Sequence, residues 1–520
     1  MTTLEVTTHR QPGAGSSTAR RWVALAVLML PVLLVSVDNT VLAFALPQLS
    51  EALQPTGTQL LWIVDVYPLV LAGLLVPMGS LADRVGRRRL LLIGATGFAA
   101  VSALAAFAPT AALLIAARAG LGLFGAMLMP STLSLLRNIF TDREERRLAI
   151  AIWAAGFAAG AALGPIVGGL LLEHFWWGSV FLLAVPVLVV FLLAAPAFLP
   201  ESRDPAPGPL DVTSVLLAMG TMTPLVWAIK ETTKHGPTVT AITLAGVGLA
   251  AGAVFVRRQL RRPVPMLDVR LFRVSTFTGG VLVNLLSVFS LVGFLFFVSQ
   301  DLQLVHGLSP LQAGLTLLPG TVAMVVAGLL VVRVARVLPP GPVVAGGLTI
   351  SALGYLLISL LGGSATLAVI AAAFVLLTVG IGAAETISND LILSSAPPSR
   401  AGAASAISET AYEVGAVLGT AVLGGILSAS YRRSVELPAG LTPSEAHTAA
   451  ETLGGASTVA AGLPDGTAEA LLASAQQAFT SGVGMTAGIG VVLTLTAAAV
   501  ALATLRDPRG NEAAADRLGT

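Results

Sequence analysis

The chain has 520 residues, of which 55% are hydrophobic and 11% are charged, and its mean hydropathy is +0.87. Soluble domains carry about 25% charged residues, so this composition excludes an ordinary soluble protein. The 29 basic and 27 acidic residues leave a net charge of +2, which gives no indication of nucleic-acid binding. Because the sequence has no cysteine, disulfides, thiolate metal sites and cysteine nucleophiles are excluded as well.

Fourteen apolar segments meet or approach the length of about 20 residues that a helix needs to cross a bilayer. We therefore predict an all-α polytopic membrane protein. Its spans are predicted at 22–46, 60–82, 90–108, 111–137, 148–172, 177–199, 211–229, 239–256, 275–299, 310–332, 342–362, 366–394, 402–428 and 483–505.

The spans are grouped by their linkers into sets of six, two and six. The predicted parts are a tail at 1–21, a six-helix bundle at 22–200, an inserted hairpin at 211–256, a second six-helix bundle at 271–505 and a tail at 506–520. Within the second bundle, residues 429–482 are predicted to form a long extracellular loop without a site of its own. An amphipathic helix is predicted in that loop near residues 468–479.

Arginine placement predicts the orientation of the chain in the membrane. With the N-terminus inside, the outer side holds Lys230, Lys234, Arg432 and Arg433, and Arg118 falls within a span. All the other basic residues then lie on the inner side. The positive-inside rule therefore predicts that both termini are cytoplasmic.

A short internal repeat supports two related bundles. Residues 79–87 and 328–336 share Gly, Leu, Arg, Val and Arg at matching positions, in each case between the second and third helix of a set of six. Weak symmetry of this kind is typical of transporters built from repeats.

The sequence GSLADRVGRRRL at 79–90 resembles the loop 2–3 motif of the major facilitator superfamily. Within that superfamily, the residues look like those of the fourteen-helix drug:proton antiporters. The resemblance implies the superfamily fold, with two six-helix bundles and an inserted two-helix hairpin. It also implies that Asp83 pairs with arginines across the bundle interface as a conformational latch. The motif positions are Gly79, Asp83, Arg84, Gly86 and Arg87.

Three further segments carry the same resemblance. DNTVLAFALP at 38–47 is similar to the first-helix motif of the fourteen-helix group, and PMLDVRLF at 265–272 is similar to its segment before helix 9. RAGLGLFGA, which begins at Arg118, is similar to the arginine motif that the family ties to proton transfer. Leu121 stands where the family usually has Gln, which puts the local hydrogen-bond network in doubt.

The fifth predicted span carries a stripe of small residues. Its residues resemble the antiporter motif that separates exporters from symporters, although such a stripe alone equally indicates close helix packing. Pro165 permits a bend because it lacks an amide proton. The stripe consists of Gly156, Gly160, Gly164, Pro165, Gly168 and Gly169.

Ionisable residues inside a membrane cost at least about 2.5–3.5 kcal/mol each, so each is a functional candidate. The candidates are Asp38, Asp65, Arg118, Glu385, Glu409 and Glu413. The acids outnumber Arg118, and acids in excess of basic partners are more useful as proton or cation sites than as structure. An alternative for any one acid is a buried pair with Arg118 that merely fixes packing.

The predicted roles follow from depth and spacing. Asp38 and Asp65 lie in the outer half of the first bundle and are assigned, with Arg118, to proton coupling. Glu409 and Glu413 are i, i+4 neighbours, so they cannot both ionise cheaply in a low dielectric. We assign these two, together with Glu385, to substrate or proton binding.

Two aromatic residues and one amide complete the candidate set. Trp62 and Tyr67 can line a cavity for lipophilic cations through their ring faces. An interfacial aromatic belt explains Trp62 equally well. Asn284 is either a polar cavity residue or part of an interhelical hydrogen bond.

We interpret the chain as a proton-coupled antiporter of the bacterial inner membrane that exports amphiphilic, cationic compounds by alternating access. We expect it to work as a monomer in the lipid bilayer, driven by the proton motive force, with no cofactor, metal, nucleic acid or enzymatic activity. An importer or symporter of a metabolite remains an alternative, as does a non-transporting membrane receptor or scaffold.

Overall fold

The computed structural model describes residues 18–203, 211–263, 265–361, 365–395 and 401–505, so most of both predicted tails lies outside it. All regular elements of the described residues are helical. Thirteen of these helical segments are long and apolar enough to cross a membrane. A further helix of 32 residues, α5, completes the predicted set of fourteen, so the predicted fold class is confirmed.

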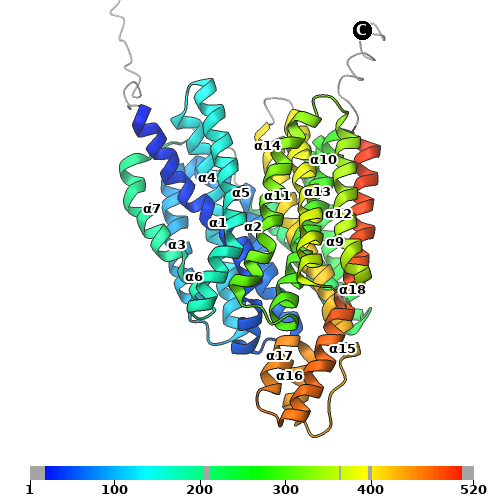
Figure 1. Cartoon of the computed structure of the whole chain (residues 1–520). Coiled ribbons are helices and arrows are strands. Elements are labelled where there is room, and N and C mark those ends of the chain that lie inside the picture. Colours follow the sequence, from blue (N-terminus) through cyan, green and yellow to red (C-terminus); the bar gives the residue numbers. More distant parts are fainter. Residues whose placement is uncertain (1–17, 204–210, 264, 362–364, 396–400, 506–520) are drawn as a thin grey trace, which may run out of the picture.

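The first half of the chain forms one bundle, at the blue and cyan end of the colour scale (Figure 1). Its helices are α1 (Thr18–Leu53), α2 (Gly57–Val85), α3 (Arg87–Ala106), α4 (Ala111–Ile139), α5 (Arg143–His174), α6 (Ser179–Leu182) and α7 (Ala184–Phe198). The inserted hairpin consists of α8 (Val212–His235) and α9 (Val239–Arg261). Of the hairpin, α8 packs against α2.

The second half forms the other bundle. After a 3-10 turn, Val269–Arg273, come α10 (Ser275–Gln300), a π-helical turn (Asp301–Val305), α11 (Pro310–Val334), α12 (Pro340–Leu361) and α13 (Leu367–Ser394). The last part comprises α14 (Ala401–Gly419), a second π-helical turn (Thr420–Gly424), α15 (Gly425–Ser434), α16 (Pro443–Glu451), α17 (Leu453–Ala460) and α18 (Asp465–Thr504).

The second helix of each half begins with the same N-terminal capping motif. At the start of α2, the Thr56 side chain accepts from the amide of Gln59, and the Gln59 side chain accepts from the amide of Thr56. Ser309 and Gln312 form the same reciprocal pair at the start of α11. Such a capping box satisfies two amides that have no partner within the helix. Related local signals therefore start the second helix of each half.

The predicted loop at 429–482 is largely helical. It contains part of α15, all of α16 and α17, and the first turns of α18, which begins at Asp465 rather than near residue 483. The helix predicted near 468–479 exists, but it is continuous with the final span. Thr442 caps α16 and Thr452 caps α17. These caps explain how a polar, alanine-rich segment forms ordered helices.

The two halves meet at the end of the molecule that carries α16 and α17, which we call the loop end. There, Gln303 donates to the carbonyl of Phe44 at 3.2 Å, and the amide of Gly57 donates to Glu451 Oε2 at 2.8 Å. At the opposite end, where α1 begins and α18 ends, the ribbons of the two halves diverge (Figure 1). We call this the terminal end.

Candidate substrate and proton site

Asp38 of α1 and Arg118 of α4 form an ion pair inside the first half. Arg118 Nη1 donates to Asp38 Oδ2 at 2.8 Å, and Arg118 Nε donates to the carbonyl of Ile63 at 3.1 Å. The guanidinium carbon lies 4.5 Å from the ring centroid of Tyr67. Asp38 and Arg118 are 7% and 2% exposed, so this cluster joins α1, α2 and α4 away from solvent.

Asp65 of α2 forms a second buried ion pair, with Lys230 of α8. Lys230 Nζ lies 2.8 Å from Asp65 Oδ2, and both side chains have no exposed surface. The same ammonium lies 3.9 Å from the ring centroid of Trp62. Trp62 in turn packs edge-on against Trp227, one helical turn before Lys230. The ring face of Trp62 and the carboxylate of Asp65 therefore enclose the Lys230 ammonium between them.

The burial of Lys230 corrects the prediction that this lysine lies outside the membrane. The inserted helix continues to His235 instead of ending near Ile229, so Lys230 remains inside α8. Close packing of α8 on α2, where Met219 lies directly against Gly73, brings the ammonium to Asp65. The described spans thus bury two basic side chains, and the predicted excess of acids falls accordingly.

The membrane-embedded glutamates of the second half have no such partners. Among the described residues, Glu385 of α13 and Glu409 and Glu413 of α14 make no ion pair. Glu385 Oε1 is buried without a hydrogen-bond partner in the described part of the chain, and Glu413 is 7% exposed. Unpaired carboxylates in such surroundings are costly as anions, so they favour a proton or a cationic ligand.

Electrostatic coupling links these glutamates to the first half. Tyr67 of α2 lies within electrostatic range of both Asp38 and Glu413, and Arg137 of α4 lies within range of Glu409. Since α14 packs against α2, Glu413 faces the Asp38 and Arg118 cluster across the boundary between the halves. The structure therefore brings predicted residues of both halves to one central region.

Asn284 forms interhelical hydrogen bonds. Its Nδ2 donates to Ser408 Oγ at 3.1 Å and to Asn389 Oδ1 at 3.3 Å, and Ser408 donates to the same oxygen at 2.8 Å. This network joins α10, α13 and α14 next to Glu409. Asn284 thus fixes the rotation of the helix that carries the glutamates, and Ser408 and Asn389 are partners that the sequence reasoning missed.

Tyr67 has no exposed surface and lies beneath the Arg118 guanidinium. Its hydroxyl has no hydrogen-bond partner among the described residues. Trp62 is partly buried and its ring face is occupied by Lys230. In this conformation both aromatic rings therefore contact protein cations.

The loop 2–3 motif is held within the first half. Asp83 accepts from Arg87 at 2.8 Å, and Arg87 also donates to Ser202. Gly86 adopts a φ of 116°, and a Cβ there would lie 2.7 Å from Glu201 Oε1. Among the described residues, Asp83 therefore pairs within its own loop, and the expected pairing with an arginine across the bundle interface is not seen there. The i, i+4 spacing across the short turn gives Asp83 a nearer partner.

Glycines of the α5 stripe lie against α1. A Cβ at Gly160 would be 2.7 Å from Ser36, and one at Gly168 would be 2.6 Å from Val41. Gly156 and Gly164 face Met29 and Thr40 of the same helix, and Gly79 lies against Pro130. Small residues therefore allow α1 and α5 to approach closely.

Two other residues of α5 meet the second half. A Cβ at Gly169 would lie 2.5 Å from the Cα of Leu311, and the carbonyl of Pro165 lies equally close to a Cβ built at Gly314. These backbone contacts join α5 to α11 near the loop end. One face of α5 therefore packs against α1 within the first half, and another face contacts α11 of the second half.

Comparisons with known proteins agree with this architecture. The model of the Major Facilitator Superfamily matches residues 28–420. Among solved structures, a bacterial homolog of the human lysosomal transporter Spinster superposes with a TM-score of 0.67 at 17% sequence identity. That alignment covers 94% of this chain and 98% of the other, and it shows a shared fold.

Curated relatives match over most of their length. The chain is 59% identical over 489 residues to the multidrug efflux pump LfrA of Mycolicibacterium smegmatis, which covers 94% of this chain and 97% of that protein. It is 39% identical to the methyl viologen resistance protein SmvA of Salmonella typhimurium, covering 88% and 93%. It is 34% identical to the tetracenomycin C resistance and export protein of Streptomyces glaucescens, covering 96% of each.

Proposed function

This chain belongs to the major facilitator superfamily and is a drug efflux transporter within it, and we propose that it exchanges amphiphilic cations for protons. The observation that carries the proposal is the set of unpaired carboxylates on α13 and α14. A carboxylate without a protein cation can hold either a proton or a cationic substrate. Similarity to a methyl viologen resistance protein supports this choice of substrate, since methyl viologen is an aromatic dication.

Exchange follows from competition for the same oxygens. Protonation of Glu413 or Glu409 weakens their attraction for a cation, and a bound cation opposes protonation by the same free energy. Glu385 lies on the neighbouring α13 and acts electrostatically, with Glu413, on Tyr412. We assign the three glutamates to alternate between proton and drug, driven by the proton motive force without a resident cofactor.

We assign the two buried ion pairs, Asp38 with Arg118 and Asp65 with Lys230, to conformational control and not to drug binding. Arg118 and Lys230 act as tethered cations that neutralise the aspartates while the loop end is closed. A proton arriving at either aspartate would release its basic partner. Because the Asp65 pair joins α2 to α8, protonation there would loosen the inserted hairpin from the first bundle.

We place the terminal end in the cytoplasm of a bacterial inner membrane. The arginine distribution supports this orientation, and exporters load from the cytoplasm. Contacts at the loop end then make the described conformation the one that receives drug from inside. The conformational residues Gly79, Asp83, Arg84, Gly86 and Arg87 lie on the cytoplasmic side in this orientation. We propose that a single chain suffices, because both halves of the site come from one polypeptide.

The orientation can be tested cleanly because the natural chain has no cysteine. Ala461→Cys at the loop end and Ser275→Cys at the terminal end each give one exposed thiol. We expect a membrane-impermeant maleimide to label Ala461→Cys in intact cells and Ser275→Cys after lysis alone. The reverse labelling pattern would overturn the proposed orientation.

Proton coupling can be tested in proteoliposomes with an imposed pH gradient. We expect wild-type protein to move ethidium or methyl viologen against the proton flow and to lose this activity when nigericin collapses the gradient. Glu413→Gln should lose gradient-driven transport, whereas Asp390→Asn, at an exposed acid of α13, should retain it. Transport indifferent to the gradient would overturn coupling, and movement of drug with the protons would favour a symporter.

A further inference from the structure

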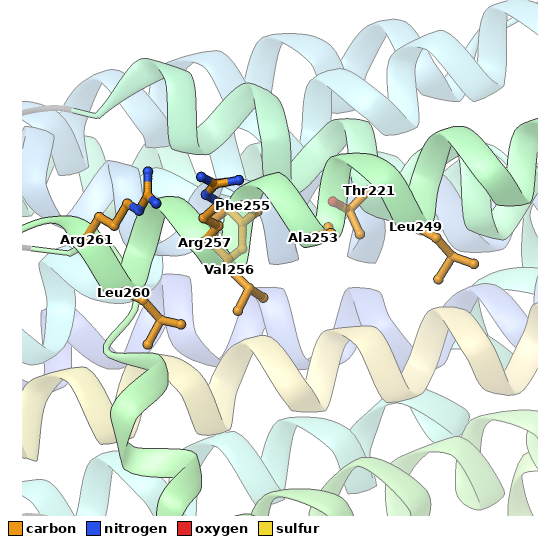
Figure 2. Close-up of a pocket in the computed structure, with 9 residues that line it drawn as sticks. Thr221, Leu249, Ala253, Phe255, Val256, Arg257, Leu260 and Arg261 are labelled. Carbon is orange, nitrogen blue, oxygen red and sulfur yellow. The ribbon is translucent and has the colours of Figure 1, made fainter.

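The inserted hairpin carries an open groove that faces away from the transport site. The groove has a volume of about 710 Å³, and its lining comes from α9 and from Thr221 of α8. Leu249, Val256 and Leu260 form its apolar side, on one side of α9 in Figure 2. In α9, 11% of the most apolar window is buried, the lowest share of the thirteen spans, so this surface faces lipid.

Two arginines border the groove at its terminal end, Arg257 and Arg261. They are i, i+4 neighbours, and both side chains extend to the same side of α9 in Figure 2. Both side chains are exposed. Neither makes an ion pair or side-chain hydrogen bond in the described part of the chain, and none of the lining residues is acidic.

The other two arginines of the same helical turns are occupied. Arg258 Nη2 lies 2.9 Å from Asp211 Oδ1, and Arg262 Nη1 lies 3.2 Å from Asp211 Oδ2. Burial raises the pKa of Asp211, but hydrogen bonds from Arg258 and Ser214 outweigh it and hold the pKa at about 2. Asp211 is therefore an anion at any working pH and keeps Arg258 and Arg262 in place.

A buried amide fixes the rotation of α9 as well. Gln259 Nε2 donates to Ser214 Oγ at 2.7 Å, and its Oε1 accepts from the amide of Met266 at 2.8 Å. With Gln259 and Arg258 turned toward α8, Arg257 and Arg261 must point away from it. The sequence RRQLRR thus divides into one pair that holds the hairpin together and one pair left for an outside anion.

We propose that this groove binds an anionic phospholipid, with its phosphate on Arg257 and Arg261 and an acyl chain along Leu249, Val256 and Leu260. Guanidinium groups bind phosphate oxygens through charge-assisted, paired hydrogen bonds. Basic pockets between helices on the cytoplasmic side suit acidic lipid headgroups. Two unpaired arginines repel the cationic drugs that the transport site is proposed to take. The ligand therefore differs in charge from the substrate.

Native mass spectrometry of the full-length protein in detergent can test the site. The probes are phosphatidylglycerol and phosphatidylcholine with the same acyl chains, so the headgroup charge is what differs. We expect wild type to prefer phosphatidylglycerol, and R257Q/R261Q to bind it roughly tenfold to thirtyfold more weakly, for two lost arginine contacts. Ala253→Trp, which fills the groove without changing charge, should weaken binding as well. Glycerol phosphate, which lacks acyl chains, should not compete.

R333Q/R336Q is the matched control, because it removes two exposed arginines outside the groove, one in the last turn of α11 and one in the turn that follows it. It should bind phosphatidylglycerol as wild type does. An unchanged lipid preference in R257Q/R261Q, or an equal loss in the control pair, would overturn the proposal. Competition by glycerol phosphate would indicate a soluble phosphate ligand instead. All these readouts are independent of transport, and thermal unfolding of each variant verifies its fold.

Discussion

In the first half, the aspartates of α1 and α2 each lie 2.8 Å from a basic side chain, whereas the glutamates of α13 and α14 form no ion pair among the described residues. Asp38, Asp65 and Glu413 are buried, and Glu385 and Glu409 are partly buried. The difference lies in what neutralises them. Asp38 and Asp65 are neutralised by the protein itself, and the glutamates need a proton or a ligand from outside.

This contrast suggests that the two related bundles have different roles, one in conformational control and the other in ligand exchange. A paired acid is stable in one conformation and becomes expensive when its partner leaves, so it suits the control of movement. An unpaired acid is expensive as an anion in every conformation, so it suits exchange between ligands. The inserted hairpin enters this division directly, because its Lys230 neutralises an acid of the first bundle.

The largest effect is expected from Arg118. Arg118→Gln leaves Asp38 as a buried charge without compensation and removes the donor to the Ile63 carbonyl. We expect a loss of about 3–5 kcal/mol in the free energy of unfolding and no measurable transport in proteoliposomes. Thermal unfolding in detergent measures the first. The double variant Asp38→Asn/Arg118→Gln should recover much of the stability, and a double variant as unstable as the single one would contradict the pairing.

The Asp65–Lys230 pair should show the same pattern of stability loss and recovery, with a smaller effect on transport. Lys230→Met leaves Asp65 as a buried charge without a partner and should lower the free energy of unfolding by about 3–5 kcal/mol. The double variant Asp65→Asn/Lys230→Met should restore most of that loss. If the pair works only in packing, the double variant will transport normally. If Lys230 controls movement of the hairpin as proposed, the double variant will be stable but will lose its dependence on the pH gradient. Lys234→Met is the control, because Lys234 lies one helical turn beyond Lys230 in α8 and forms no ion pair with Asp65 among the described residues.

The glutamates should respond in the opposite direction. Glu385→Gln, Glu409→Gln and Glu413→Gln each remove an unpaired carboxylate, so we expect unfolding free energies that stay level or rise by about 1 kcal/mol. Gradient-driven transport should nevertheless fall at least tenfold in Glu413→Gln, measured as ethidium flux. A destabilised Glu413→Gln protein would reveal a structural partner and would remove the contrast between the halves.

The sequence could predict features that depend on local pattern. Apolar run length located the spans, and the positions of Asp38, Arg118 and the glutamates within them followed directly. The capping boxes at Thr56 and Ser309, seen in the structure, are also local features, because each needs only four consecutive residues.

Features that depend on distant partners were out of reach. Lys230 comes at the end of an apolar run. At such a position the sequence alone does not distinguish a lysine inside a membrane-spanning helix from a lysine at the membrane surface. Its pairing with Asp65 depends on how α8 packs against α2. The signal that was available is Trp227 three residues earlier on the same face, together with an acid in α2 that lacked a partner. Asp83 was assigned a partner across the interface, although Arg87 at i+4 was a nearer choice.

The smallest predicted effect concerns an acid of the second half that does have a partner. Asp301 lies 3.3 Å from His306 at the loop end, and this hydrogen bond raises the pKa of His306 from 6.5 to about 9. Because the folded state holds the proton more tightly, the stabilisation is fully present below pH 6.5 and is lost as the pH rises through about 9. For a partly exposed imidazole we expect about 1 kcal/mol after allowing for solvent screening.

Thermal unfolding between pH 6 and pH 10 measures that loss directly. His306→Gln should flatten the pH profile, while His447→Gln, at a mostly exposed histidine 3.9 Å from Glu451, should leave it as in wild type. Stability that rises with pH across this range would contradict the assigned sign. A flattened profile would show that an acid of the second half stabilises the fold when it has a basic partner. The absence of such partners around the glutamates of α13 and α14 would then reflect their role in transport and not their position in the second half.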